Sequence, residues 1–318
     1  MRQAVYVEDT DGYSVVYHAN YLKYAVRAVH GILGGAAKVQ KSCQEEECRL
    51  VVKAVRLQRF MAGAILGAVV DMHVTLAAVE DDKLDCYVTM SPPDDKDKPY
   101  TDLLFTISCE DEMGPCPLPP DLVDAAGAHK GELPTMISNG FVGLKFKFAA
   151  GPNLSCAAGP RSRAKCYNVP FEVQPDECDD PTGWLSNRSI INFFERGRNL
   201  NDPETGKTLL GRLKDEEGQL IFMGRFDHLD FNQRPHRVAP GSKVEVRTAM
   251  VPLNENTQIQ NHQSLWLISR DGTGEPSRDD VLLASAFCFC AITDLDRKPV
   301  PIVDWWVNAI ADFTGMDV

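Results

Sequence analysis

The two halves of this 318-residue chain carry the same pattern of elements in the same order. In each half an aspartate-containing turn precedes an apolar helical stripe, strand-like segments follow, and a Pro-x-Pro sequence closes the unit. Asp11 and Asp180 in the two turns are 169 residues apart. Pro117 and Pro299 in the closing sequences are 182 residues apart. The small difference indicates loops of different length between elements that keep their order, so we expect two tandem copies of one fold.

A helix is expected directly after each turn. In the first half, apolar side chains recur at helical spacing, namely Tyr21, Tyr24, Ala25, Ala28, Val29 and Ile32. Gly34 and Gly35 predict the end of this helix. The second half has a shorter stripe of the same kind, made by Ile190, Phe193, Phe194 and Gly197.

Strand patterns follow each helix. Residues 70–76 alternate apolar and polar side chains, as in a half-buried strand. Further strands are predicted at 50–60, 83–90 and 103–109, and in the second half at 168–177, 244–248, 258–270 and 281–293. A helix followed by a run of strands is typical of an α+β fold, with the helix packed on an antiparallel sheet. We predict domains over residues 1–123 and 167–318, joined by a linker or insertion at 124–166.

Composition excludes some classes of function. The net charge of −12 argues against a general nucleic-acid binder, which needs a basic surface. The longest mainly apolar stretches, 61–70 and 281–293, are shorter than the about 20 residues that span a bilayer. The N-terminus lacks the apolar run of a secretory signal. We therefore expect a cytoplasmic protein without a membrane span, or an organellar one if a transit peptide has been removed.

The ten cysteines are scattered and none is in a Cys-x-x-Cys pair. Cys43 and Cys48 come closest to a metal spacing, but no His or Cys pair follows at the distance of a zinc site. The sequence therefore predicts no metal site, and we expect mostly buried, reduced thiols.

The first turn carries a family resemblance. The segment Asp11-Gly-Tyr-Ser-Val-Val-Tyr-His-Ala-Asn-Tyr21 resembles the signature of the 4-hydroxybenzoyl-CoA thioesterase family, in which an Asp-x-x-Gly-Val-Val-Tyr-like turn enters the central helix of a hotdog fold. Asp180-Pro-Thr-Gly183 matches the same turn. Phe193-Phe-Glu-Arg196 and Asp294-Leu-Asp-Arg-Lys-Pro-Val-Pro301 are similar to later parts of the family pattern. The resemblance covers roughly residues 1–123 and 168–303.

The resemblance implies an architecture. It predicts two tandem hotdog domains, each a long central helix packed on an antiparallel sheet, that form an intramolecular pseudo-dimer. Two pseudo-equivalent sites are then expected between the halves. A further homodimer of double hotdogs is a possible assembly.

The resemblance also implies chemistry. Asp11 and Asp180 take the role of general base or nucleophile, and backbone N–H groups near Tyr17 and His18, or near Ser186 and Asn187, hold the developing oxyanion. A helix N-terminus suits that role because its N–H groups and dipole favour negative charge. His18 is expected to assist. The substrate contacts are expected from Tyr17, Asn20, Tyr21, Asn187 and Arg59. No cofactor is expected beyond the CoA of the substrate.

The sequence departs from the family pattern differently in each half. Ser14 replaces the usual glycine of the first turn, whereas Gly183 keeps it. Ala25-Val26 replace an aromatic-Glu pair that Phe194-Glu195 retain. The second half has Ser186-Asn187 in place of Tyr17-His18. These departures leave open whether one site or both are active. Asp9 is expected to be a solvated neighbour of the turn.

The function expected is hydrolysis of a fatty or aromatic acyl-CoA to free acid and CoA. Three alternatives stay open at this point. They are an acyl-carrier-protein thioesterase, a hotdog dehydratase or hydratase, and a non-catalytic protein that binds acyl thioesters.

Overall fold

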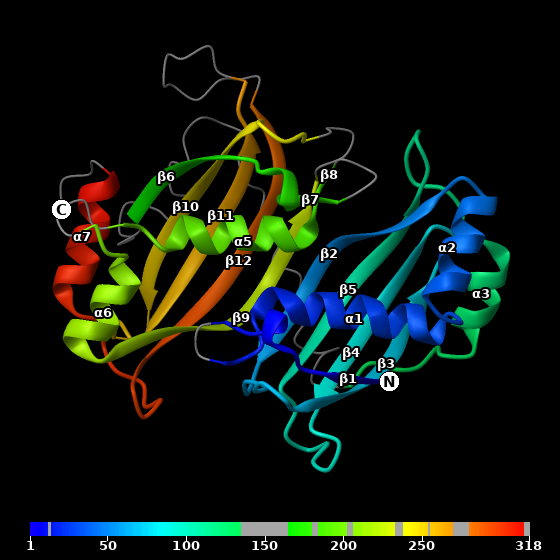
Figure 1. The fold of residues 1–318 in the computed structure, drawn as a ribbon, viewed down its shortest axis with the longest axis horizontal. Helices are drawn as coiled ribbons and strands as arrows, with labels where there is room; N and C mark the ends of the chain where they lie inside the picture. Colours follow the sequence, from blue (N-terminus) through cyan, green and yellow to red (C-terminus); the bar gives the residue numbers. More distant parts are fainter. Residues whose placement is uncertain are drawn as a thin grey trace. The chain divides into compact units, whose positions relative to one another are not determined.

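The computed structural model of the chain divides into two compact units, Met1–Lys147 and Phe148–Val318 (Figure 1). The structure describes residues 1–11, 14–134, 165–179, 184–201, 206–232, 238–253, 255–269 and 280–314. Among these residues, no helix is both long enough and apolar enough to cross a membrane.

The first unit is a five-stranded antiparallel sheet with a long helix across it (Figure 1). Its strands follow the spatial order β1-β3-β4-β5-β2. The elements in chain order are β1 (Arg2–Ala4), η1 (Val7–Asp9), α1 (His18–Ile32), α2 (Ala36–Glu45), β2 (Arg49–Phe60), β3 (Val69–Val79), β4 (Lys83–Ser91), β5 (Thr101–Glu110) and α3 (Pro120–Gly127).

The second unit repeats this arrangement. Its antiparallel strands follow the order β6-β10-β11-β12-β9, which is the order of the first unit with each strand replaced by its counterpart. The elements are β6 (Lys165–Glu172), η2 (Pro175–Glu177), β7 (Cys178–Asp179), β8 (Trp184–Leu185), α5 (Asn187–Arg198), α6 (Leu209–Glu217), β9 (Gln219–Phe231), β10 (Lys243–Leu253), β11 (Gln258–Leu267), β12 (Val281–Asp294) and α7 (Asp304–Thr314). The predicted α+β fold with two tandem copies is confirmed.

The predicted apolar stripe is the buried face of α1. Tyr21, Tyr24, Ala25, Ala28 and Val29 are all buried, and the helix packs against β3. The helix ends where predicted, because Gly34 and Gly35 both adopt positive φ angles, 103° and 99°. In the second unit α5 lies against β10 and β11 (Figure 1).

Two further helices, α2 and α6, follow the central helices and were not predicted. In α2 only Val39, Ser42 and Cys43 are buried, and in α6 only Leu209 and Leu213 are. So narrow a buried stripe is hard to distinguish from a polar loop in the sequence.

The first unit continues beyond residue 123, where the sequence placed its end. Helix α3 runs to Gly127. The N–H of Leu76 in β3 then donates to the carbonyl of His129 at 3.0 Å, and the N–H of Gly131 donates to the carbonyl of Leu76 at 3.1 Å. Residues 124–131 are therefore tied to the first sheet, and residues 135–164 of the predicted linker lie outside the described residues.

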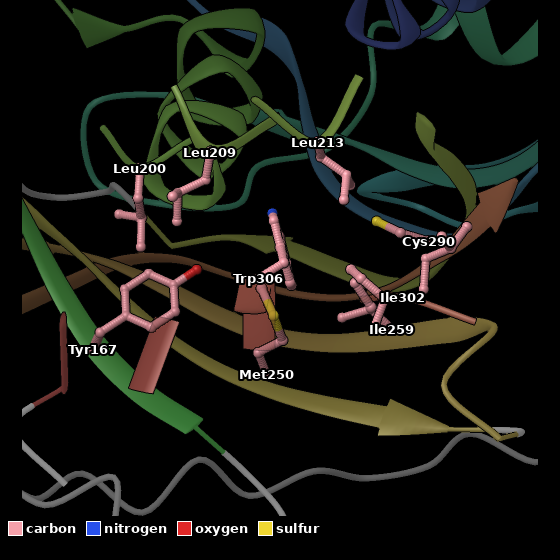
Figure 2. Packing of buried hydrophobic residues seen from close by; sticks show 10 residues of the cluster. Tyr167, Leu200, Leu209, Leu213, Met250, Ile259, Cys290, Ile302 and Trp306 are labelled. Atoms are coloured by element: carbon pink, nitrogen blue, oxygen red, sulfur yellow. The ribbon is translucent and has the colours of Figure 1, made fainter. Parts of the chain in front are cut away.

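An apolar cluster lies in the second unit, beside α6 and α7. Figure 2 shows its side chains gathered between α6 and the strands of the sheet, with Trp306 of α7 among them. The buried members are Tyr167, Leu200, Leu209, Leu213, Met250, Ile259, Cys290, Ile302, Trp306 and Ile292. Burial of each large apolar side chain contributes about 1.5–3 kcal/mol, so this cluster fixes α6 and α7 on the sheet.

Two helical glycines give a matched test of this packing. A Cβ at Gly197 in α5 would lie 2.6 Å from Cγ1 and 3.0 Å from Cβ of Val246 in β10, and neither atom can move away freely. A Cβ at Gly31 in α1 would meet only the flexible Sδ of Met1, at 3.3 Å. We expect Gly197→Ala to lower the free energy of unfolding by about 1–3 kcal/mol.

Gly31→Ala is the control, and it should be neutral or should stabilise by up to about 1 kcal/mol through helix propensity. Urea denaturation of the full chain measures both. Equal stability of the two variants would contradict the close packing of α5 on β10.

Candidate active site at the start of each central helix

The turn before α1, residues 8–17, is named here the first acidic turn. The N–H of Asp11 donates to the carbonyl of Val15 at 2.8 Å, and the N–H of Ser14 donates to the carbonyl of Asp11 at 3.0 Å. The loop after β2 braces this turn, since the N–H of Val16 donates to the carbonyl of Ala64 at 2.8 Å. The N–H and the carbonyl of Asp11 are therefore both held by hydrogen bonds.

Ser14 occupies a conformation that favours glycine. Its φ is 59°, in the left-handed region. This explains why a glycine is usual in the family pattern that the turn resembles. Serine keeps the conformation here at some cost in backbone strain.

The carboxylate of Asp11 is exposed and lies near the start of α1. Its Oδ1 accepts a hydrogen bond from the N–H of Val15 at 3.4 Å. Burial raises the pKa of Tyr21 to about 12, and the negative charge of Asp11 contributes to that rise. The N–H of Ala64 donates to the Tyr21 hydroxyl at 3.1 Å and so acts in the opposite direction. Asp11 and Tyr21 therefore interact electrostatically across the turn.

Aromatic side chains gather at the same helix end. The rings of Tyr17 and His18 are 4.4 Å apart. Phe60 of β2 lies 6.2 Å from the His18 ring and 6.0 Å from the Tyr21 ring. Of the residues predicted for the site, the structure thus brings Asp11, Tyr17, His18 and Tyr21 together.

Asn20 is fixed in the first turn of α1 and is 1% exposed. Its Nδ2 donates to the carbonyl of Asp9 at 3.0 Å, which orients the amide. Its Oδ1 is buried and has no hydrogen-bond partner among the described residues. A buried acceptor of this kind offers a place for a donor from a ligand or water.

Asp9 was expected to be solvated, and that prediction was wrong. Asp9 is 2% exposed, and its Oδ2 accepts a hydrogen bond from the N–H of Tyr6 at 3.2 Å. Its carbonyl accepts from the N–H of Tyr17, the N-cap residue of α1, at 2.9 Å. Lys23 of α1 places its Nζ 3.6 Å from Oδ1. Its hydrogen bonds and the nearby cation offset the cost of burying this carboxylate.

The second unit repeats this arrangement in the turn at residues 176–186, named here the second acidic turn. Glu177 takes the place of Asp9. Its Oε2 accepts from the N–H of Gln174 at 2.8 Å, and its carbonyl accepts from the N–H of Ser186 at 3.0 Å. Arg196 of α5 supplies the cation, with Nη1 2.6 Å from Oε1. The sequence signal for these contacts is an acidic residue three positions after Tyr6 and after Gln174, which is the spacing of a capping box.

The predicted residues of the second turn are only partly described. Asp180 lies outside the described residues. Asn187 is the first residue of α5 and is half-buried. The N-cap residue Ser186 uses its own Oγ to accept a hydrogen bond from the N–H of Ser189 at 3.0 Å. Helix α1 has no such bond from its N-cap side chain, Tyr17, so the two helix starts differ.

Arg59 lies apart from this group. Its Nε donates to Oδ1 of the buried Asp102 at 2.8 Å, and Nη2 pairs with Oδ2 of the same carboxylate. Tyr87 also donates to Asp102, at 2.9 Å. Successive side chains of a strand point to opposite faces, and Phe60 points toward His18 and Tyr21. Arg59 is therefore on the other face of the sheet, which is a structural reason for its pairing with Asp102.

Sequence comparisons cover only part of the chain. No family model matches it. Two relatives from strains of Helicobacter pylori, both described as acyl-CoA thioesterase YbgC, are 38% identical over 76 residues. The aligned region is 24% of this chain and 54% of each relative. The chain thus spans about half the length of the curated relatives it matches.

Three solved structures match over nearly the whole chain. An oleoyl thioesterase from Lactobacillus plantarum has a TM-score of 0.61 at 12% identity, covering 95% of this chain and 96% of that one. A 12:0-ACP thioesterase from Umbellularia californica has a TM-score of 0.59 at 9% identity, covering 92% and 93%. An acyl-ACP thioesterase from Bacteroides thetaiotaomicron has a TM-score of 0.56 at 11% identity, covering 91% and 96%. The repeated helix-on-sheet units and these matches together show that the chain has a tandem double-hotdog fold.

Proposed function

We propose that this protein hydrolyses acyl thioesters, with acyl-CoA as the substrate and the start of α1 as the main working site. The observation that carries the proposal is the position of Asp11. Its carboxylate is exposed on a turn closed by backbone hydrogen bonds, beside the N-terminus of a fifteen-residue helix. Tyr17, His18 and Tyr21 lie at the same helix end. The partial identity to the two acyl-CoA thioesterases supports the same activity.

In the proposed reaction a water molecule attacks the thioester carbonyl carbon and gives its proton to Asp11. The carbonyl oxygen gains negative charge, which the N–H groups and the dipole of the α1 N-terminus stabilise. The carbon–sulfur bond then breaks, and the sulfur takes the proton held by Asp11 and leaves as the thiol. In the nucleophilic variant Asp11 itself attacks and water hydrolyses the resulting anhydride.

Two further side chains have proposed roles. The buried Oδ1 of Asn20 accepts a hydrogen bond from the attacking water or from the substrate. The ring of His18, at the first position of α1, assists by hydrogen bonding to the reacting groups.

The second acidic turn is proposed to contribute less to turnover. Ser186 satisfies one N–H group at the start of α5 with its own side chain, so that helix offers fewer donors to an oxyanion. Asp180 matches Asp11 in the sequence and is proposed as a second catalytic carboxylate of lower activity.

An acyl-carrier-protein substrate is the second candidate. Two of the full-length structural matches are described as ACP thioesterases. Against it, a carrier protein is acidic and this chain has a net charge of −12, so the long-range electrostatic interaction is repulsive.

Thiol release from acyl-CoAs of varied chain length is the first test. We expect Asp11→Asn to lower kcat about 10²–10⁴-fold, the usual contribution of a general base, and Asp180→Asn to lower it much less. Glu8→Gln, which neutralises the exposed neighbour in the same turn, is the control and should leave kcat unchanged. Free thiol is followed with a chromogenic disulfide reagent.

Wild-type protein that releases no thiol from any CoA or carrier-protein thioester would refute the hydrolase proposal. Faster turnover of acyl-carrier protein than of the matched acyl-CoA would favour the second candidate. Formation of a hydroxyacyl or enoyl thioester without thiol release would identify a hydratase or dehydratase instead.

Asp9 is proposed as a positioning residue, because its carbonyl and carboxylate fix the backbone before α1. We expect Asp9→Ala to lower the free energy of unfolding by about 1–3 kcal/mol, since the N–H of Tyr6 loses its acceptor and Lys23 its partner. Asp9→Asn keeps one acceptor oxygen and should lose less of both stability and kcat. Urea denaturation and thiol release are measured in parallel.

If Asp9→Ala were as stable as wild type, the contacts of the Asp9 carboxylate with Tyr6 and Lys23 would not fix this turn. If Asp9→Asn lost as much kcat as Asp11→Asn while remaining equally stable, Asp9 would be the catalytic carboxylate and the assignment would be reversed.

A further inference from the structure

Three thiols from two distant parts of the sequence lie together at one place in the first unit. The sulfur atoms of Cys48, Cys109 and Cys116 all lie within 4.8 Å of one another. The sulfurs of Cys109 and Cys116 are 3.6 Å apart. Cys109 is fully buried and the other two are half-buried.

The pairing of β2 with β5 creates this group. In the antiparallel register Arg49 is opposite Glu110 and Leu50 is opposite Cys109. Cys48 comes just before the first of these residues, so the strand pairing carries it to the end of β5. In the sequence Cys43 and Cys48 come closest to a metal spacing, but Cys109 and Cys116 follow too far along the chain to suggest one site; the pairing of β2 with β5 removes that distance.

Backbone hydrogen bonds hold the thiol-bearing loops in place. The N–H of Cys116 donates to the carbonyl of Cys109 at 3.0 Å, closing the loop after β5. Inside that loop Oδ1 of Asp111 accepts from the N–H of Met113 and of Gly114, at 2.6 and 2.9 Å. The N–H of Cys48 donates to the carbonyl of Cys43 at 2.8 Å. The thiols are therefore presented by ordered backbone, as a metal site requires.

Cys43 adds a fourth thiol. It lies in the last turn of α2 and is 7% exposed. Its carbonyl accepts the hydrogen bond from the N–H of Cys48 at 2.8 Å, which keeps Cys43 beside the three-thiol group.

We propose that Cys48, Cys109, Cys116 and Cys43 bind one zinc ion. Zinc–thiolate bonds of about 2.3 Å in a tetrahedron place the sulfurs about 3.8 Å apart, close to the spacing of the three-thiol group. Cys43 is proposed as the fourth ligand because its backbone is hydrogen-bonded to Cys48, and its side chain turns toward the other three sulfurs when zinc binds. Each thiol loses its proton to solvent as its bond to zinc forms.

A disulfide explains the arrangement less well. A Cys109–Cys116 bond would use two of the four thiols and leave Cys48 beside them unused. It would also need an oxidant, whereas zinc binding is not a redox reaction. The zinc site joins the end of α2 to the end of β5, so its role is structural and it does not depend on the proposed hydrolase activity.

The test is metal content of the full chain purified under reducing conditions. After exhaustive dialysis, elemental analysis should find one zinc per chain. Replacement by Co²⁺ should give a thiolate-to-cobalt charge-transfer band together with the strong visible bands of tetrahedral cobalt. Chelation should lower Tm without any change in covalent structure.

Matched variants locate the ligands. Cys48→Ala and Cys116→Ala should each lower zinc affinity at least tenfold and weaken the charge-transfer band. Cys116 is half-buried in a loop, so that variant tests binding even if Cys48→Ala folds poorly. Cys43→Ala should weaken binding less, since it leaves intact the three thiols whose sulfurs already lie within 4.8 Å of one another. Cys86→Ala is the control, because Cys86 is a fully buried thiol of β4 outside the cluster and should leave zinc content unchanged.

Three results would overturn the proposal. One is reduced wild-type protein that retains no zinc and gives no charge-transfer band with Co²⁺. Another is zinc that stays bound in both Cys48→Ala and Cys116→Ala. The third is peptide mapping of anaerobically isolated protein that finds a Cys109–Cys116 disulfide in place of metal.

Discussion

Before each central helix an acidic residue, Asp9 (buried) or Glu177 (partly buried), bonds to the N-cap, and the candidate chemistry depends on that constraint. The carbonyls of Asp9 and Glu177 accept hydrogen bonds from the N–H groups of Tyr17 and Ser186. The two carboxylates accept from the backbone three residues earlier, so each acidic residue connects both sides of its turn. A buried N–H group without a hydrogen-bond acceptor costs about 1–3 kcal/mol, which is enough to hold the turn in one conformation. The hydrogen bonds of Asp9, together with those that close the turn around Asp11, therefore fix the backbone that carries the exposed Asp11 carboxylate.

Both units contain these hydrogen bonds of the acidic residue, while the residues around them differ. In the second unit a glutamate and an arginine replace the aspartate and lysine of the first, yet the same backbone bonds form. The divergence falls instead on the groups that would face a substrate. Ser186 caps α5 with its hydroxyl, whereas Tyr17 adds an aromatic ring next to His18. A tandem chain permits this division, because one copy can stabilise the fold while the other retains the exposed reactive groups.

Local patterns in the sequence predicted the elements that bury a wide apolar face. The stripe of α1 and the strands β2 to β5 are examples, and their repetition predicted a second unit, although its strand β9 (Gln219–Phe231) was not predicted. The same patterns missed α2 and α6, whose buried stripes are narrow. They also predicted that Asp9 is exposed to solvent, as a charged residue in a turn usually is. The sequence does not show that Asp9 is bonded to Tyr6, Tyr17 and Lys23 in the folded chain. The structure places Asp11, Tyr17, His18 and Tyr21 at one helix end, whereas Arg59, expected from the sequence as a substrate contact, pairs with Asp102.

What local patterns cannot supply is strand register, and register explains the remaining differences. The pairing of β2 with β5 sets Arg59 opposite Asp102, which gives the arginine a buried carboxylate on the face away from α1. The same pairing sets Leu50 opposite Cys109 and so brings Cys48 to the other thiols. A slip of one residue would turn Arg59 toward His18 and move Cys109 away from Cys48, because side chains alternate along a strand. One ladder of backbone hydrogen bonds therefore decides both why Arg59 lies apart from the candidate active site and why a zinc site can form at the far end of the same two strands.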